Sequence, residues 1–299
     1  LDERQLLFYS TVISASEREA AYVIDGLQQN EVIQSTIHST DTHGFTETVF
    51  AVSPFINTAF APRIKDIGDQ NIYSFSARKT YEKRGYQILP SRLINLRLIE
   101  SYWEDILRFM ATIKLKHTTA SQLFKRLSSY AKDHPLYQAL KEFGRIIKSI
   151  FILTYFDDVE LRQRIEKQLN KVELSNRFSK AVFFANNSEF KCGLPEEQEI
   201  AAACKVFIQN AIVLWNYLYL SQLLANNADP EEQKRMLGSI KRGSVITWHH
   251  INLHGEYDFT KHAANQAIFD MEKILGLKGA GARGRAPNTR CARWGSWIR

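Results

Sequence analysis

The spacing of hydrophobic residues separates a mixed N-terminal part of the chain from a long helical part. Residues 15–30 carry an apolar stripe at three- and four-residue spacing, which predicts a helix. β-Branched residues over 33–40 predict a strand that ends just before Asp41, and residues 72–75 predict a second, short strand. Between these strands Pro54 interrupts a helical pattern, so a helix there should be short or broken.

After residue 92 the periodicity is helical almost throughout, as far as about residue 186, and it returns further along the chain. The helices expected in this part cover residues 93–113, 135–156, 157–186, 195–225 and 261–275. Strands therefore belong mainly to the N-terminal part. The expected fold class is α/β (α+β) with a large helical portion.

The composition is that of a folded chain, because 44% of its 299 residues are hydrophobic and can form a sizeable core. Its three cysteines stand far apart and form neither a pair with zinc-ligand spacing nor a disulfide framework. No signal-peptide pattern opens the chain, so we expect a reduced, cytoplasmic setting. The apolar stretch 206–224 contains four Asn and Gln residues, which favours a core helix over a membrane span.

The net charge of +7 rests mostly on the last 21 residues. Residues 279–299 contain five arginines and no acid, whereas the rest of the chain has 34 basic and 32 acidic residues, a net charge of +2. This tail is rich in Gly and Arg and aperiodic, so we expect disorder. Either the tail binds DNA electrostatically or, the preferred interpretation, it is a non-native extension past a domain end near Lys278.

Two acidic residues are candidates for chemistry. Asp41 follows the predicted strand, where a carboxylate either holds a metal ion or simply belongs to a turn. Glu173 lies inside a predicted helix, with Arg177 and Lys180 four and seven residues further along the same face. That face is either a solvated set of ion pairs or a helix that offers a carboxylate to a metal and cations to DNA phosphates.

Six segments of the chain share their order and spacing with a known protein family. The segments are EREAAYVIDGL, HSTDTHGFTETVFAV, FAPRIKDIGDQNIYSF, NKVELSNRFSKAVFF, IQNAIVLWNYLYL and WHHINLHGEYDF. Together they closely resemble the C-terminal catalytic part of transposases of the replicative Tn-three transposon family. The resemblance covers nearly the whole chain, from about residue 10 to residue 278.

The resemblance implies an RNase H-like DDE transposase, in which three carboxylates bind two Mg²⁺ ions. Asp41 matches the family's second acid and Glu173 its third, and Lys180 completes the family's E-x(6)-K pattern. The first acid would lie upstream of this chain, since Asp25 belongs to a different motif. The resemblance therefore implies a fragment, inactive alone, of an enzyme that cleaves DNA at transposon ends and joins them to target DNA.

Four segments are expected on this basis. They are the first part of an incomplete RNase H-like catalytic core over residues 1–91, an all-helical insertion over 92–156, the glutamate helix with a helical C-terminal region over 157–278, and the basic tail over 279–299. The expected partners are transposon-end and target DNA and, in the intact protein, a second copy of the chain. No membrane is expected, and the setting is the bacterial cytoplasm with nucleoid association.

Further residues are candidates for DNA contact or for the third acid. His43 lies in the segment of the second acid and is either a residue near the substrate or metal, and so a candidate for DNA contact, or a turn histidine. Arg63 and Lys65 lie in the segment that follows and either contact DNA phosphates or belong to a solvated loop. Glu256 is the alternative third acid. The histidines within 249–254 are interpreted as ordinary histidines, because no carboxylate or cysteine stands at ligand spacing.

Two other function classes remain open beside the enzyme. One is a non-catalytic DNA-binding or assembly fragment, and the other is a helical scaffold protein. An acidic pocket shared by Asp41 and Glu173 would favour the enzyme. DNA binding that survives the loss of Asp41 and needs no divalent metal would favour the binding fragment, whereas two solvated acids would favour the scaffold.

Overall fold

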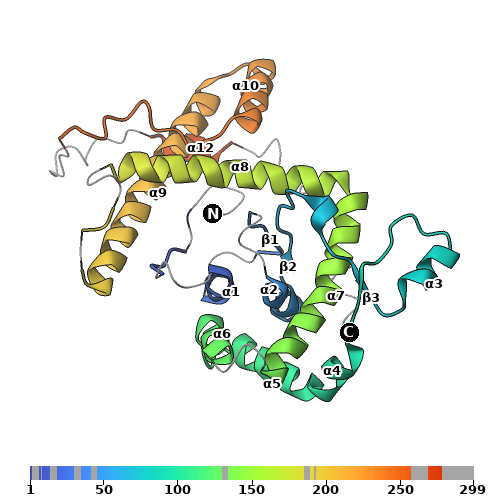
Figure 1. Ribbon diagram of the computed structural model, residues 1–299. Helices are drawn as coiled ribbons and strands as arrows, with labels where there is room; N and C mark the ends of the chain where they lie inside the picture. Colours follow the sequence, from blue (N-terminus) through green and yellow to red (C-terminus); the bar gives the residue numbers. More distant parts are fainter. Residues whose placement is uncertain are drawn as a thin grey trace. The chain divides into compact units, whose positions relative to one another are not determined.

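The structure of the chain is a computed structural model (Figure 1). It describes residues 1, 7, 9–13, 19–29, 35–41, 46–129, 134–184, 189–191, 193–256 and 269–277. By their internal contacts these residues form two compact units. The first unit lies within Ile13–Leu169, and the second combines residues of Leu1–Val12 with residues from Asn170 onward.

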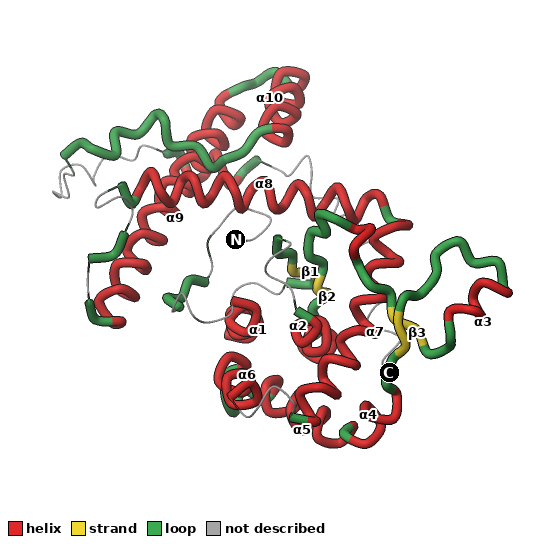
Figure 2. The backbone as a smooth tube through the Cα atoms, in the orientation of Figure 1, coloured by secondary structure: helices red, strands yellow, loops and turns green. Residues whose placement is uncertain are grey.

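Helices dominate both units, and the described strands are only two residues long (Figure 2). The elements of the first unit are α1 (Glu19–Gln29), β1 (Ile37–His38), α2 (Glu47–Val52), the 3₁₀ helix η1 (Ser53–Ile56), β2 (Ala59–Phe60), η2 (Ile67–Asp69), β3 (Tyr73–Ser74), α3 (Arg78–Lys83), β4 (Arg92–Leu93), α4 (Leu96–Ser101), α5 (Trp103–Lys114), α6 (Ala120–Ser129), α7 (Pro135–Asp157) and the start of α8 (Val159–Val182). The second unit holds the rest of α8, α9 (Pro195–Asn226), α10 (Pro230–Arg242) and α12 (Met271–Leu275).

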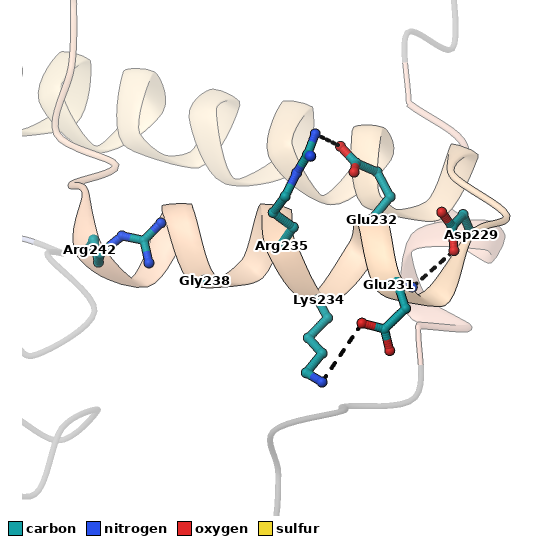
Figure 3. Close-up of a pocket in the computed structure, with 7 residues that line it drawn as sticks. All are labelled: Asp229, Glu231, Glu232, Lys234, Arg235, Gly238 and Arg242. Carbon is teal, nitrogen blue, oxygen red and sulfur yellow. Dashed lines mark hydrogen bonds and ion pairs between the residues drawn. The ribbon is translucent and has the colours of Figure 1, made fainter.

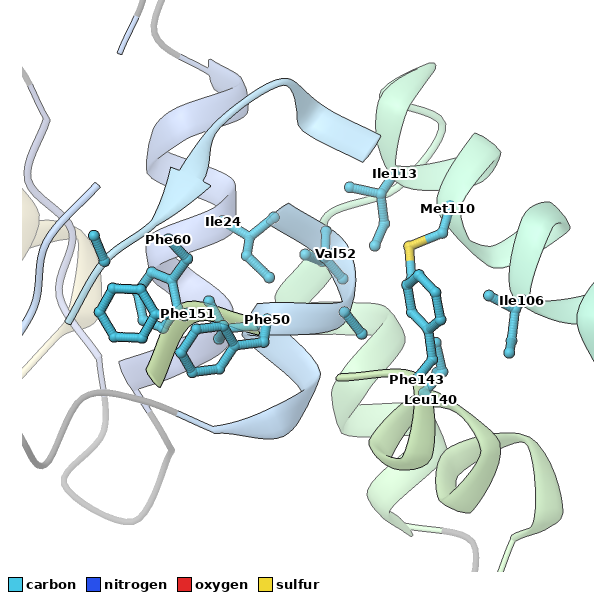
Figure 4. Packing of buried hydrophobic residues seen from close by; sticks show 14 of the residues in the cluster. Ile24, Phe50, Val52, Phe60, Ile106, Met110, Ile113, Leu140, Phe143 and Phe151 are labelled. Carbon is cyan, nitrogen blue, oxygen red and sulfur yellow. The ribbon is translucent and has the colours of Figure 1, made fainter. Parts of the chain in front are cut away.

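The core of the first unit forms where the short helix α2 packs against the long helix α7 (Figure 4). Phe50 of α2 is buried, and its ring centroid lies 4.9 Å from that of Phe60 and 5.7 Å from that of Phe151. Helix α5 adds Ile106 and Met110, which stand one helical turn apart on its buried face. The apolar stripes of these helices therefore meet in one continuous core.

Helix α6 begins at a carboxylate that another helix supplies. Asp25 of α1 is buried, with 5% of its surface exposed. Its Oδ1 accepts a hydrogen bond of 2.6 Å from the Ala120 backbone N–H, and its Oδ2 accepts one of 3.3 Å from Ser121 N–H. A negative charge at a helix N-terminus satisfies unpaired N–H groups and interacts favourably with the helix dipole. Asp25 thus has a structural role, which agrees with its exclusion from the acids expected to bind metal.

Substituting Asp25 with alanine is expected to lower the free energy of unfolding by about 2 kcal/mol, because buried N–H groups of α6 would lose their acceptor. Urea denaturation followed by circular dichroism measures the change. Asp25→Asn keeps one carbonyl acceptor and should cost less than Asp25→Ala. Equal stability of Asp25→Ala and the unsubstituted chain would show that the cap contributes nothing.

In the second unit, polar residues of α9 bind irregular backbone. Asn216 is buried, and its Nδ2 donates to the carbonyl oxygens of Val245 and Thr247 at 2.8 and 2.9 Å. The segment that follows those residues packs on α8, where the ring of Trp248 stacks on that of Phe178 with centroids 5.1 Å apart. The core of the second unit is therefore formed by α9, the C-terminal half of α8 and an irregular segment that contacts both helices.

Helix α9 is long and apolar enough, by length and composition alone, to span a membrane. Core helices of soluble proteins pass the same test. Within its unit α9 buries Gln209 and Asn216, and Asn210 both accepts from the Leu7 N–H and donates to the Leu7 carbonyl, at 3.1 and 2.9 Å. Asn210 and Asn216 thus hydrogen-bond to backbone within their own unit, whereas only 22% of the most apolar 18-residue window of α9 is buried, so the core helix stays a prediction.

Most of the predicted elements agree with the structure, but β2, α3 and α10 were not predicted, and two of the predicted helices are divided or only partly described. The helix expected over 93–113 is divided, because residues 92–93 form β4 beside β3 and α4 ends at Ser101 before α5 begins. Pairing with β3 overrides the helical pattern there. The last helix, expected over 261–275, is described only as α12, since residues 257–268 lie outside the described part.

Candidate strand-end and helix site

Asp41 lies at the C-terminal end of a hydrogen-bonded strand. β1 and β2 are parallel, with His38 opposite Phe60. Their backbone bonds continue past the two-residue core of the pair: Ala59 N–H donates to Thr36, Ala61 N–H to His38 and Arg63 N–H to Thr40, at 2.9, 2.8 and 2.8 Å. The ladder therefore runs to Thr40, and Asp41 is the first residue beyond it, with an exposed side chain. This is where the β-branched pattern predicted the strand to end.

Arg63 lies at the same end of the strand pair as Asp41, because its N–H bonds to the carbonyl of Thr40. Its guanidinium forms an ion pair with Glu166 of α8 over 3.7 Å. Lys65 is exposed in the loop after β2. Arg63 is thus partly engaged by an acid, while Lys65 is exposed at the surface, so the two candidates for DNA contact differ in their surroundings. His43 lies outside the described residues.

The strand that leads to Asp41 also carries two buried polar atoms with no hydrogen-bond partner, Nε2 of His38 and Oγ1 of Thr40. The His38 ring lies nearly parallel to that of Phe60, at 12° and 6.1 Å. Burial lowers the pKa of His38 from 6.5 to about 4. His38 is not among the candidate residues that the sequence patterns indicated. The period-2 alternation of the strand, which puts residues 36, 38 and 40 on one face, could have indicated it.

His38 should make the stability of the chain depend on pH. In the folded state His38 stays neutral down to about pH 4, whereas in the unfolded chain it binds a proton below 6.5. Stability is therefore full above pH 6.5 and falls as the pH drops towards 4. Between pH 7 and pH 5 the loss from His38 is expected to be about 2 kcal/mol.

Urea denaturation at pH 7 and pH 5 tests this contribution. The variant His38→Gln keeps a side chain of similar length without a titrating ring, so its stability should fall less over the same interval by about 2 kcal/mol. Acidic residues titrate equally in both proteins and cancel in the difference. Equal pH dependence of the two proteins would show that His38 is not held neutral by the fold.

Glu173, Arg177 and Lys180 all lie in helix α8 and all are exposed. Their spacing of four and seven residues puts them on one face of the helix. The opposite side carries Ser175 and Phe178, which are buried in the core of the second unit. Packing of Phe178 therefore fixes which face of α8 turns outward, and that face carries one carboxylate and two cations.

The two acids expected to bind metal belong to different units, Asp41 to the first and Glu173 to the second. Each is an exposed carboxylate within its unit. Glu256, the alternative third acid, is also exposed and lies in the second unit. Among the residues that the structure describes, no three His, Cys, Asp or Glu side chains are grouped so as to hold a metal ion. The histidines within 249–254 are accordingly not grouped as a metal site.

A surface depression on α10 carries many charges but no candidate chemistry (Figure 3). Its charged side chains pair with one another along the helix: Arg235 with Glu232 at 2.9 Å and Lys234 with Glu231 at 3.9 Å. Asp229 accepts a hydrogen bond of 3.0 Å from the Glu231 N–H and so caps the helix. These are the contacts of a solvated helix face, so the charges of the depression are accounted for by ion pairs within the helix.

The donor chemistry of the two acids suits Mg²⁺. This ion takes hard oxygen ligands, commonly one or two carboxylates together with water and substrate phosphate. Asp41 and Glu173 offer carboxylate oxygens at exposed positions, and each stands on or beside a regular element that fixes its backbone. Each of the two carboxylates therefore fits, by itself, the ligand type that Mg²⁺ prefers.

The family of the chain follows from comparison with known proteins. The model of the family "Tn3 transposase DDE domain" matches residues 1–257. Among curated relatives, the transposase for transposon Tn501 of Pseudomonas aeruginosa is 36% identical over 252 residues, which are 84% of this chain and 25% of that protein. The transposase for transposon Tn2501 of Escherichia coli is 37% identical over 257 residues, again 84% and 25%.

A third relative matches a longer part of this chain. The transposase for transposon Tn1546 of Enterococcus faecium is 34% identical over 277 residues, which are 91% of this chain and 27% of the relative. The chain thus spans about a quarter of the length of the curated relatives that it matches. The family match includes both the strand end at Asp41 and the helix of Glu173. The resemblance of the sequence motifs is confirmed: the chain belongs to the Tn3 transposase DDE domain family.

Proposed function

We propose that this chain supplies two of the metal-binding carboxylates of a DNA transposase, Asp41 and Glu173. The observation that carries the proposal is the family match over residues 1–257, which contains both acids in their motif segments. The reaction is cleavage of DNA at the transposon ends, followed by transfer of the freed 3′-OH to target DNA in replicative transposition. The fold around the acids is an RNase H-like core with a helical insertion.

Each functional residue has a separate task in this proposal. Asp41 and Glu173 bind divalent metal through their carboxylate oxygens, and the intact protein holds two Mg²⁺ ions. Bound Mg²⁺ activates the attacking oxygen and stabilises charge on the leaving oxygen. Arg177 and Lys180 stand on the outward face of α8 with Glu173 and hold DNA phosphates, because an Arg or Lys contact positions the backbone without reading sequence.

On the strand side, Arg63 and Lys65 lie in the segment that follows β2, and His43 belongs to the motif of the second acid. We assign them to contacts with the DNA backbone near the reacting phosphate. The intact protein acts as a homodimer in the bacterial cytoplasm on nucleoid DNA. The 299-residue chain alone is expected to cleave no DNA, because the resemblance assigns it only two of the three acids.

A cleavage and joining assay with the intact protein tests the proposed function. The substrate is a labelled duplex that carries the end sequence of the transposon encoding the protein, and the target is a supercoiled plasmid. With Mg²⁺ we expect a nick that leaves a 3′-OH at the transposon end, and then joined product. With EDTA we expect neither. Binding of the duplex without cleavage under all metal conditions would instead favour a non-catalytic DNA-binding or assembly role.

A further inference from the structure

Helix α3 belongs to an arm that stands out from the rest of the first unit (Figure 1). We define the α3 arm as residues 75–93, which leave the unit after β3 and return through β4. α3 has no buried residue and makes no extensive contact with another described element. Such an exposed projection contributes little to the core, so its side chains are available for a partner.

The base of the α3 arm is fixed to the unit. β3 and β4 are parallel, with Tyr73 opposite Arg92. The Tyr73 N–H donates to Ser149 Oγ of α7 at 2.9 Å. Pro90, just before β4, is buried. The arm is therefore an ordered projection with two anchored ends rather than a loose loop.

The tip of the arm is shaped by a left-handed turn after α3. Gly85 has φ +76°, a conformation that suits glycine. Its N–H donates to the Glu82 carbonyl at 3.0 Å, and the Tyr86 N–H donates to the Tyr81 carbonyl at 3.3 Å. The rings of Tyr81 and Tyr86 pack with centroids 5.9 Å apart. This is the Schellman arrangement that ends helices, so Tyr86 is held in place before any partner binds.

The surface of the α3 arm is strongly basic. Residues 75–93 contain five Lys and Arg residues and one Glu, whereas the chain without its last 21 residues has a net charge of only +2. The one acid, Glu82, pairs with Arg78 at 2.9 Å. Lys79, Lys83 and Arg84 are exposed. A local excess of positive charge on a projection attracts a polyanion.

The α3 arm also exposes large apolar side chains. Phe75 is 61% exposed and Tyr86 is 56% exposed, and Leu93 at the base of the arm is 58% exposed. Aromatic rings set among cations are the pattern that binds single-stranded nucleic acid, because unpaired bases stack on the rings while Lys and Arg hold the phosphates. In a duplex the bases are already stacked on one another, so exposed rings gain less there.

We propose that the α3 arm binds single-stranded DNA, with Lys79 and Lys83 at phosphates and Phe75 stacked on an unpaired base. The inference rests on the proposed function, which makes DNA the substrate and produces a freed strand end. It adds DNA-contacting residues other than those assigned in the proposed function. The arm carries exposed rings as well as positive charge. Positive charge alone would suffice to bind a duplex, so the rings favour single-stranded DNA as the ligand.

Fluorescence anisotropy with the 299-residue chain and a labelled 20-nucleotide single strand tests the inference. Lys79→Gln/Lys83→Gln should weaken binding about ten-fold and make the slope of log K against log salt shallower by about 1.4, because two phosphate contacts are lost. The matched control is Lys114→Gln/Lys167→Gln, which removes the same charge from exposed helix positions elsewhere in the first unit. The control should leave the slope unchanged.

The aromatic contact is tested separately. Phe75→Ala should weaken single-strand binding about ten-fold and leave duplex binding within two-fold, because stacking needs an unpaired base. Leu115→Ala, which removes a 65% exposed apolar side chain outside the arm, is its control and should change neither. Circular dichroism of each variant checks that the helical content is retained.

Two outcomes overturn the inference. One is a chain that binds no single-stranded DNA, and the other is an equal effect of the arm variants and their controls. Neither outcome affects metal-dependent cleavage by the intact protein, which tests the proposed function. Conversely, intact protein that cleaves nothing while Phe75→Ala lowers single-strand binding would contradict the proposed function and leave the arm as a DNA-binding surface.

Discussion

Replacing Asp41 with asparagine in the intact protein is expected to reduce cleavage at the transposon ends about a thousand-fold. Asparagine keeps the size of the side chain and one oxygen, but it removes the negative charge that a divalent cation needs. Because Asp41 is exposed past the end of the β1–β2 ladder, the fold should lose less than about 0.5 kcal/mol. The readouts are the rate of 3′-OH formation on a labelled duplex and the urea midpoint.

Matched acid variants make this expectation specific. Asp66→Asn removes an exposed carboxylate from the same unit and should leave the rate within two-fold. Glu173→Gln should match Asp41→Asn, because both acids serve the same metal site in the proposal. Glu256→Gln should be neutral. A large loss with Glu256→Gln and none with Glu173→Gln would transfer the third acid to Glu256.

Substituting Gly144 with alanine is expected to destabilise the chain by about 3 kcal/mol or more. Gly144 lies in α7 where α2 crosses it, and a Cβ there would lie 1.8 Å from the carbonyl oxygen of Glu47 and 2.6 Å from its carbonyl carbon. These are backbone atoms, so no side chain can rotate away. The two helices would have to separate, which would open the core around Phe50 and Phe151.

Gly238→Ala is the matched control, because Gly238 also lies inside a helix, α10. A Cβ there would meet only the end of the Arg242 side chain, at 3.9 Å. Alanine should then stabilise the chain by about 0.5–1 kcal/mol, since it restricts the unfolded state and favours the helix. The two alanine variants thus differ in sign, and urea denaturation compares them directly. If Gly144→Ala were also stabilising, α2 and α7 would not be packed as described.

The sequence patterns predicted the strand end better than the surrounding sheet. β-Branched residues before Asp41 are a local signal, and the ladder to Thr40 ends where that signal ends. β4 was missed because residues 92–93 have no strand pattern and pair with β3 through contacts made by the fold. Helix α10 could have been predicted from the sequence. Asp229 is a typical N-cap residue, Pro230 suits the first helical position and Gly243 follows the last helical residue.

Some features of the candidate site could be predicted from local sequence patterns, and others only from the family resemblance. Helical spacing alone predicted that Glu173, Arg177 and Lys180 share one face of a helix. All three residues lie in α8 and are exposed. No local pattern, however, connects Asp41 with Glu173, because 132 residues separate them in the chain. Their assignment to one metal site comes from the family. The role of Asp25 as the cap of α6 also needed the fold, because its partners lie in a distant helix.

We propose that Asp41 and Glu173 bind the same metal ions. The most direct measurement is the distance between their carboxylates in an experimental structure of the intact protein loaded with Mn²⁺, with the ions located by anomalous scattering. We expect the carboxylates to lie within about 4–8 Å of each other and to share the bound metal. Metal bound to Asp41 with Glu173 far away in solvent would contradict it.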